Sequence, residues 1–316
     1  MNPVTCSQAL DGVGSGVAAS LRAVDCAAGA TAQAAFGRLF GTDGALLPVL
    51  TILLTLYVAF FAFSLITGRS RLGISALTPR MITLGLVLTF ATSWIAYQGV
   101  VWNLAVGAPD QIAGVLMGSP AGDKGGPATQ IFADKIDVIL SALVDATGQQ
   151  AADAGAGAGA ASTFSPPGLM WLGGTLLLLG TVGVLATCKI ALAVLLALGP
   201  VFVVMALFTA TRGLFTGWLK GVVLLAIAPL FAVLGGSLML ELSVPVVRTL
   251  TSTPGQIDAR AAMAFFMIGT VHVALMIMVL KVAATMVAGW RVFGLVAERA
   301  GEAPARAASL AAAAAA

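Results

Sequence analysis

Five apolar runs, each long enough to cross a lipid bilayer, constrain this chain more than any other feature of its sequence. They are Leu46–Ile66, Met81–Val106, Leu169–Phe208, Trp218–Leu240 and Ala262–Ala288. A hydrocarbon core of about 30 Å takes roughly 20 apolar residues as a helix. In lipid, only helices and closed barrels satisfy their own backbone hydrogen bonds, and runs of this length are typical of helices. The sequence therefore predicts an all-α, polytopic transmembrane helical bundle.

Composition and motifs argue against catalysis and against nucleic-acid binding through a basic surface. Only 9% of the 316 residues are charged, against about 25% in soluble proteins, and the sixteen Lys and Arg residues form no basic stripe. The chain contains no HExxH or GxSxG motif and a single histidine, so it lacks the ligands for a multi-histidine metal site and a recognisable hydrolase nucleophile. We expect no enzyme activity, no cofactor and no metal.

The positions of the cations predict the orientation in the membrane. The loop Thr67–Arg80 carries Arg69, Arg71 and Arg80 and no acidic residue, which indicates a cytoplasmic location by the positive-inside rule. The N-terminal tail then lies in the periplasm. The long loop Gly107–Gly168 is mostly acidic where it is charged, in agreement with a periplasmic position.

The third apolar run, Leu169–Phe208, leaves the number of spans open. Its 40 residues would extend about 60 Å as one helix, roughly twice the bilayer core. Two spans hinged at Lys189 give six spans in all, whereas one tilted or protruding span gives five. Five spans keep more cations on the cytoplasmic side and are preferred, with the N-terminus periplasmic and the C-terminus cytoplasmic. A protruding apolar arm would need protein cover.

These patterns divide the chain into five parts. They are a periplasmic N-terminal amphipathic helical segment (1–44), a first transmembrane hairpin (45–106), a periplasmic loop with a docking helix (107–168), a C-terminal transmembrane helical bundle (169–290) and a cytoplasmic Ala-rich tail (291–316).

Two segments outside the apolar runs show helical periodicity. Near the N-terminus, Leu10, Val13, Val17, Leu21 and Val24 predict an amphipathic helix flanked by Cys6 and Cys26. In an oxidising periplasm we expect these cysteines to form a disulfide rather than free thiols. In the long loop, one helical face holds Phe132, Ile136, Ile139, Leu140 and Leu143. Glycine-rich linkers, including the run Gly155–Ala160, flank this second helix, so the loop reads as a mobile arm whose helix docks on a partner surface.

Ionisable residues that lie deep in the apolar runs or at the end of one include Lys189, Glu241, His272 and Lys281. Such groups in a membrane suggest function by default. His272 and Lys281 would then line a pore or make interhelical contacts. The preferred alternative is a neutral His272 hydrogen-bonded to a neighbouring helix and a Lys281 that snorkels to the interface. Lys189 would face a lumen, lipid headgroups or Glu241.

Glycines and a proline mark the helix contacts. Gly213, Gly217 and Gly221 form a doubled GxxxG pattern, which permits close helix approach and suggests oligomerisation, although ordinary anchoring is equally compatible with it. Gly199 and Pro200 predict a kink or local unwinding in the preceding run.

The stretch LALGPVFVVMALFTATRGLFTGWLKGVV, Leu196 to Val223, closely resembles the central block of the TrbL-type, or sixth VirB-type, inner-membrane subunit of type IV secretion and conjugation systems. That family has a Gly-Pro span followed by a Thr-Arg-x-x-Phe-x-x-Trp turn. The matching positions are Gly199, Pro200, Thr211, Arg212, Phe215 and Trp218. N-terminal cysteines, an arginine-bearing first loop, a long periplasmic loop and an Ala-rich tail agree in outline.

The resemblance implies a non-enzymatic, multi-pass subunit of the bacterial inner membrane. Such subunits form a homo-oligomeric ring, expected to be a pentamer, that passes DNA or protein substrate and serves as a platform for pilus assembly. The implied partners are the minor pilin at the pilus tip, the major pilin, and inner-membrane and periplasmic scaffold subunits, while separate ATPases supply energy. The alternative function is a multi-pass secondary transporter of a small solute.

Overall fold

The computed structural model of the chain describes residues 3–41, 44–67, 74–118, 127–153, 164–208, 211–252 and 256–290. Within these ranges the ordered elements are helices, and no strand occurs there. Three features predicted above lie outside the described residues: Arg69 and Arg71 of the first loop, the linker Gly155–Ala160 and the tail 291–316.

The N-terminal segment is a pair of helices, α1 (Pro3–Asp11) and α2 (Val17–Phe40), instead of the single amphipathic helix that the periodicity predicted. The chain turns between them, and the turn is fixed by Asp137 of α7 (Ala128–Asp153). The Asp137 carboxylate accepts the backbone N–H of Val17 at 2.7 Å and that of Ala18 at 3.0 Å. A Cβ at Gly16 would lie 2.8 Å from this carboxylate. A side chain 120 residues away in sequence thus caps the start of α2.

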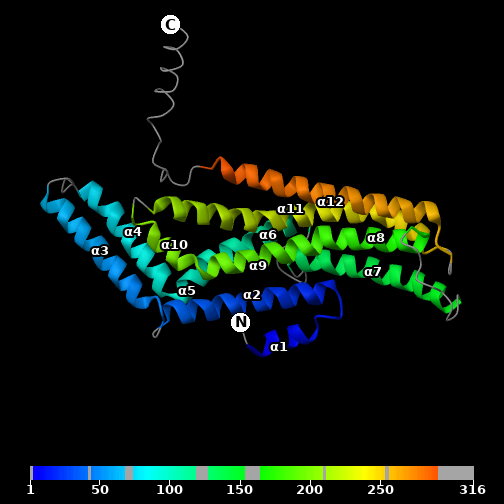
Figure 1. Cartoon of the computed structure of the whole chain (residues 1–316), viewed down its shortest axis with the longest axis horizontal. Helices are drawn as coiled ribbons and strands as arrows, with labels where there is room; N and C mark the ends of the chain where they lie inside the picture. The colour runs from blue at the N-terminus through cyan, green and yellow to red at the C-terminus, as the bar shows by residue number, and fades with distance from the viewer. Residues whose placement is uncertain are drawn as a thin grey trace, which may run out of the picture.

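The first two apolar runs form α3 (Leu47–Ile66) and α4 (Ile74–Thr92), which stand as a hairpin at one end of the molecule (Figure 1). The second apolar run, Met81–Val106, is not one continuous helix. The chain breaks at Ser93, whose side chain accepts the Ala96 N–H and starts a new helix. That helix runs through α5 (Trp94–Tyr97), η1 (Gln98–Gly107) and α6 (Ala108–Leu116). It makes an angle of 104° with the end of α4.

The third apolar run is continuous through the position where a hinge was considered. α8 (Pro166–Leu178), the π-helical η3 (Leu179–Gly183) and α9 (Val184–Ala197) join into one helix of 32 residues. A hinge at Lys189 is therefore wrong. The break falls instead at Leu198, where Gly199 and Pro200 begin the short α10 (Gly199–Met205), as proline chemistry favours.

Two long helices complete the bundle, α11 (Arg212–Leu250) and α12 (Ala259–Ala288). α12 packs along α8 and α11, and α2 packs along α9 and α7. These helices run nearly side by side along the long axis of the molecule (Figure 1). Three described helices are long and apolar enough to cross a membrane, or four if the bent pair at Ser93 counts as one span. The apolar part of α3, Leu47–Phe63, is shorter than these.

The apolar face of α7 is covered by the chain itself. Phe132, Ile136 and Leu143 are at most 1% exposed. Phe132 and Ile136 share a core with Leu21 of α2 and Val233 of α11. The described part of the predicted mobile arm is thus built into the bundle. Its apolar face is not free for a separate partner, because α2 and α11 bury it.

The cap on α2 gives the first prediction. Replacing Asp137 by Ala removes both acceptors for the α2 N-terminus and should lower the free energy of unfolding by about 1–2 kcal/mol. Denaturant unfolding of the detergent-solubilised protein measures the change. The control is Asp134→Ala, because Asp134 is exposed on the same helix. Equal stability of the two variants would contradict the cap.

Candidate functional site

The break between α9 and α10 poses a hydrogen-bonding problem that defines the site. Pro200 has no N–H, so the Leu196 carbonyl four residues earlier loses its helical partner. Because the helix breaks at Leu198, the neighbouring Leu195 carbonyl needs a donor as well. In an apolar interior an unpaired carbonyl costs free energy, so donors from elsewhere in the fold must reach these two oxygens.

Two aromatic side chains supply the donors. Tyr97 at the end of α5 donates its hydroxyl to the Leu196 carbonyl at 2.8 Å. Trp218 on α11 donates its ring Nε1–H to the Leu195 carbonyl, also at 2.8 Å. Tyr97 is fully buried and Trp218 is nearly so. We call these two bonds the carbonyl latch; it joins α5, α9 and α11 at one point.

Gly199 lies directly under the latch. A Cβ at this position would overlap the Tyr97 hydroxyl and would lie 3.1 Å from Cζ2 of Trp218. Neither ring can move away easily, because each is held by its hydrogen bond. The Gly-Pro pair therefore has two separate tasks: Pro200 frees the carbonyl, and Gly199 makes room for the side chain that satisfies it.

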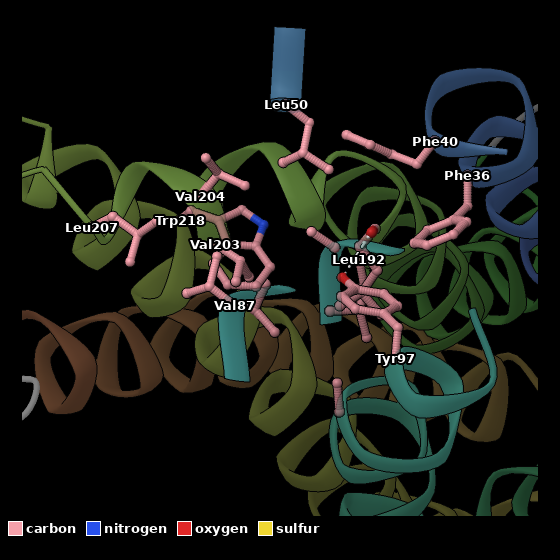
Figure 2. Close-up of a cluster of buried hydrophobic side chains, with 14 residues drawn as sticks. Phe36, Phe40, Leu50, Val87, Tyr97, Leu192, Val203, Val204, Leu207 and Trp218 are labelled. Atoms are coloured by element: carbon pink, nitrogen blue, oxygen red, sulfur yellow. Dashed lines mark hydrogen bonds between the residues drawn. The ribbon is translucent and has the colours of Figure 1, made fainter. Parts of the chain in front are cut away.

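A cluster of buried side chains surrounds the latch, and its members come from α2, α3, α4, α5, η1, α9, α10 and α11 (Figure 2). The Trp218 ring is stacked on Phe202, with centroids 5.9 Å apart and an interplanar angle of 11°. Tyr97 packs 5.9 Å from Phe36 of α2. The labelled members of the cluster are Phe36, Phe40, Leu50, Val87, Tyr97, Leu192, Val203, Val204, Leu207 and Trp218. The latch is thus also the place where the α3–α4 hairpin joins the bundle.

The turn after α10 is closed by the residues that carry the family resemblance. Thr211 donates its hydroxyl to the Met205 carbonyl at 2.7 Å, and Arg212 donates Nε–H to the Ala206 carbonyl at 3.2 Å. The ring of Phe215 packs 5.8 Å from that of Trp218. Carbonyls at a helix end need such partners. The Thr-Arg-x-x-Phe-x-x-Trp sequence therefore caps the C-terminal end of α10, and its tryptophan places the indole ring against α9.

The doubled GxxxG pattern divides into two parts. Gly221 packs within the chain, since a Cβ there would lie 3.2 Å from Leu195 Cδ1. Gly213 and Gly217 are exposed, and a Cβ at either would meet no atom of the described residues within 4 Å. We call Gly213 and Gly217 the open glycine face.

Lys189 pairs with Asp25 of α2, not with Glu241 as one of the alternatives proposed. Its Nζ lies 2.6 Å from Asp25 Oδ2, and the Lys189 side chain is 15% exposed. The next residue, Cys26, is bonded to Cys6 of α1, with an S–S distance of 1.98 Å. One turn of α2 therefore carries both the disulfide and the ion pair that ties α2 to α9.

The other ionisable residues of the runs do not gather at the latch. Glu241 and Lys281 are exposed on α11 and α12. His272 is fully buried on α12 against Gly180, so it lines no open surface, and neither ring nitrogen has a hydrogen-bond partner among the described residues. The hydrogen-bonded histidine preferred from the sequence is therefore wrong for this structure.

Sequence reasoning missed Tyr97, Asp25 and Asp137. For Tyr97 a signal existed, because a tyrosine in an apolar run needs a partner for its hydroxyl, and Pro200 releases a carbonyl. Nothing in the sequence pairs Tyr97 with the Leu196 carbonyl, because the two residues are 99 positions apart. Within the described residues, no three His, Cys, Asp or Glu side chains come together as a metal site. The latch itself is a structural joint between helices.

The latch gives the second prediction. Tyr97→Phe leaves the Leu196 carbonyl without a donor and should cost about 1–3 kcal/mol of unfolding free energy. Gly199→Ala should cost more, because its methyl group overlaps the tyrosine hydroxyl. In the double variant the hydroxyl is gone, so we expect a loss smaller than the sum of the two. Denaturant unfolding in detergent tests this, and strict additivity would contradict it.

The ion pair gives the third prediction. Asp25→Ala leaves the Lys189 ammonium without its anion and should lower the unfolding free energy by about 1–2 kcal/mol, since the Asp25 side chain is 35% exposed and partly screened by water. The reversed pair, Asp25→Lys with Lys189→Asp, should recover part of this loss in the same unfolding measurement. A reversed pair that is no better than Asp25→Ala would show that the contact contributes nothing.

A comparison with known families covers the residues of the latch and of this turn. The family model described as the TrbL/VirB6 plasmid conjugal transfer protein matches residues 54–279, which is more than half of the chain and includes the break, the turn and Tyr97. No curated protein gave a significant match. The extent of the family match shows that the chain belongs to the TrbL/VirB6 family of plasmid conjugal transfer proteins.

Proposed function

We propose that this chain is a channel and pilus-assembly platform subunit in the bacterial inner membrane, and that it works as a homo-oligomeric ring. Its family consists of non-enzymatic membrane components of conjugation and type IV secretion systems. The observation that carries the ring is the open glycine face beside the carbonyl latch. Small residues allow a second helix to approach closely in lipid, and no described residue of this chain occupies that space.

The length of the apolar helices supports the same proposal. α11 has 39 residues and extends about 58 Å, roughly twice the bilayer core. The outer face of α12 exposes Met263, Met267 and Val271, each about half accessible. Apolar surface that continues beyond the lipid needs protein cover. Neighbouring subunits of a ring would provide it.

Five spans remain our interpretation of the topology. The three long helices, the bent pair at Ser93 and α3 add up to that number when each is taken as one crossing. α3 is apolar over nearly its whole length, as a lipid-facing helix requires. The N-terminus is proposed to be periplasmic, where the Cys6–Cys26 bridge would be stable. Arg212 and Lys220 at the start of α11 would then face the cytoplasm.

The partners proposed for the ring come from the family. They are the pilins, the inner-membrane and periplasmic scaffold subunits and the separate ATPases, with DNA or protein as the transient substrate. Because α7 buries its apolar face on its own chain, contacts with pilins are proposed to use other surfaces. The alternative function, a transporter of a small solute, has no support from the family match. It would require the chain to move a solute when it is reconstituted without partners.

The fourth prediction tests the ring. Gly217→Leu fills the open glycine face and should lower both oligomer yield and conjugal transfer by roughly tenfold, the effect of about 1.4 kcal/mol at one contact. Oligomers are measured by chemical crosslinking in membranes, and transfer by complementation of a strain that lacks the protein. Gly85→Leu is the control, because Gly85 is exposed on α4 with equally open surroundings.

Two outcomes would contradict this proposal. If Gly217→Leu forms oligomers and supports transfer as well as Gly85→Leu does, the open glycine face is not a subunit contact. If the unmodified chain fails to restore transfer to the deletion strain while its partners are present, the platform function itself is wrong.

A further inference from the structure

The side of α12 that faces away from α8 carries a row of apolar side chains. Phe265 and His272 rest on Gly173 and Gly180 of the opposing helix, where a Cβ would lie 2.9 Å and 2.7 Å from the facing rings. At 3.6 residues per turn, three large residues lie on the other side of α12 from these rings. They are Met263, Met267 and Val271, each at least half exposed. We call them the α12 stripe.

A groove opens on the far side of the opposing helix. It lies between the α1–α2 turn, α7 and the helix α8–η3, and its volume is about 720 Å³, which is room for several side chains. Its apolar lining includes Val13, Val144, Leu178, Leu179 and Val182. Leu179 is 68% exposed, so the described residues cover this apolar surface incompletely. We call it the α7–α8 groove.

The stripe and the groove lie on different sides of the subunit. Thr175 and Val182, which line the groove, point away from the side on which Gly173 and Gly180 meet α12. Figure 1 shows the same order, with α12 along one edge of the molecule, the α1–α2 hairpin along the other, and α8 and α7 between them. A chain with complementary surfaces on two sides can bind further copies of itself head to tail.

The two surfaces also lie at the same height along the bundle. The two glycine contacts of α12 are seven residues apart on both helices, so α12 and α8–η3 run in the same direction and in step. By this correspondence Met267 is level with Thr175, and Val271 is level with Leu179. Rotation about an axis along the bundle leaves heights unchanged, so surfaces that meet in such a ring must lie at equal height.

Opposite charges stand at matching ends of the two surfaces. Arg260 is exposed one turn before the α12 stripe, and Asp145 is exposed on α7 at the edge of the groove. Leu143, two residues before Asp145, lies 3.6 Å from a Cβ at Gly174, which places Asp145 toward the end of α8 that adjoins the start of α12. Neither Arg260 nor Asp145 has an ion-pair partner among the described residues.

We propose that the α12 stripe of one subunit seats in the α7–α8 groove of the next copy of the chain. Methionine side chains are unbranched and flexible, so they fit an irregular groove, and the contact covers apolar surface that extends beyond the lipid. The polar rim of such a contact stays accessible to water, which leaves Ser141 open to solvent. This inference rests on the proposed ring and adds a contact at the opposite end of α11 from the open glycine face.

The first test is disulfide crosslinking in the membranes of a complemented deletion strain. Cysteines replace Met267 and Leu179 in a Cys188→Ser background, and a mild oxidant is added. We expect a ladder of linked dimers, trimers and larger multimers, because a head-to-tail contact joins each copy to two neighbours. Each single variant should give no linked multimers. Dimers from Met267→Cys alone would mean that two stripes meet symmetrically, and would overturn the proposal.

The matched control combines Met267→Cys with Val115→Cys. Val115 is 64% exposed but lies on α6, outside the groove, so this pair should not crosslink. Membrane accumulation and the Cys6–Cys26 bridge report whether each variant has folded. A folded Met267→Cys, Leu179→Cys variant that yields no more multimers than the control would overturn the contact. The platform function is tested separately, by complementation with the unmodified chain.

The second test reverses the charges. Arg260→Asp and Asp145→Arg should each lower the yield of chemically crosslinked oligomers by about two- to fivefold, as expected for an exposed ion pair. The combined variant should recover most of the yield. Arg248→Asp is the control, because Arg248 is exposed at the end of α11 and away from the stripe. A combined variant that yields no more oligomer than the single variants would contradict the pairing of Arg260 with Asp145.

Discussion

The rest of this structure depends on one requirement of an apolar environment: a backbone carbonyl that loses its helical partner must find another donor. Pro200 creates that need at Leu196, where Tyr97 donates, and the break creates it at Leu195, where Trp218 donates from a different helix. Because Pro200 has no N–H, straightening the break would still leave the Leu196 carbonyl without a helical partner. The bent pair at Ser93, the start of α11 and the short α10 are therefore positioned together by a single joint.

A second set of polar contacts fixes the other side of the bundle. The α1–α2 hairpin is bonded to itself through Cys6 and Cys26, capped by Asp137 of α7, and tied to α9 through Asp25 and Lys189. The last two contacts join α2 to helices that are more than 100 residues away in sequence. Together they explain why a segment with little hydrophobic character of its own lies lengthwise on the long apolar helices.

Sequence reasoning succeeded where local chemistry decides the outcome. Apolar runs predicted the helices, and Gly199 with Pro200 predicted the break. It failed where the outcome depends on a partner far along the chain. The bend at Ser93 comes from a serine cap inside an apolar run, which periodicity does not reveal. The partner of Lys189 is an aspartate 164 residues away. The apolar face of α7 packs on α2 and α11 of its own chain, and its periodicity alone could not tell a neighbouring molecule from the same chain.

The most direct test of this account is the side of the membrane that each end of the bundle faces. In a Cys188→Ser background, cysteines are placed at Ser141 on α7 and at Leu214 beside the family-motif turn, both exposed. A membrane-impermeant maleimide is then applied to cells with a permeabilised outer membrane. The account predicts labelling at Ser141 and protection of Leu214 until the inner membrane is opened. Labelling of Leu214 in intact inner membranes, or protection of Ser141, would contradict it.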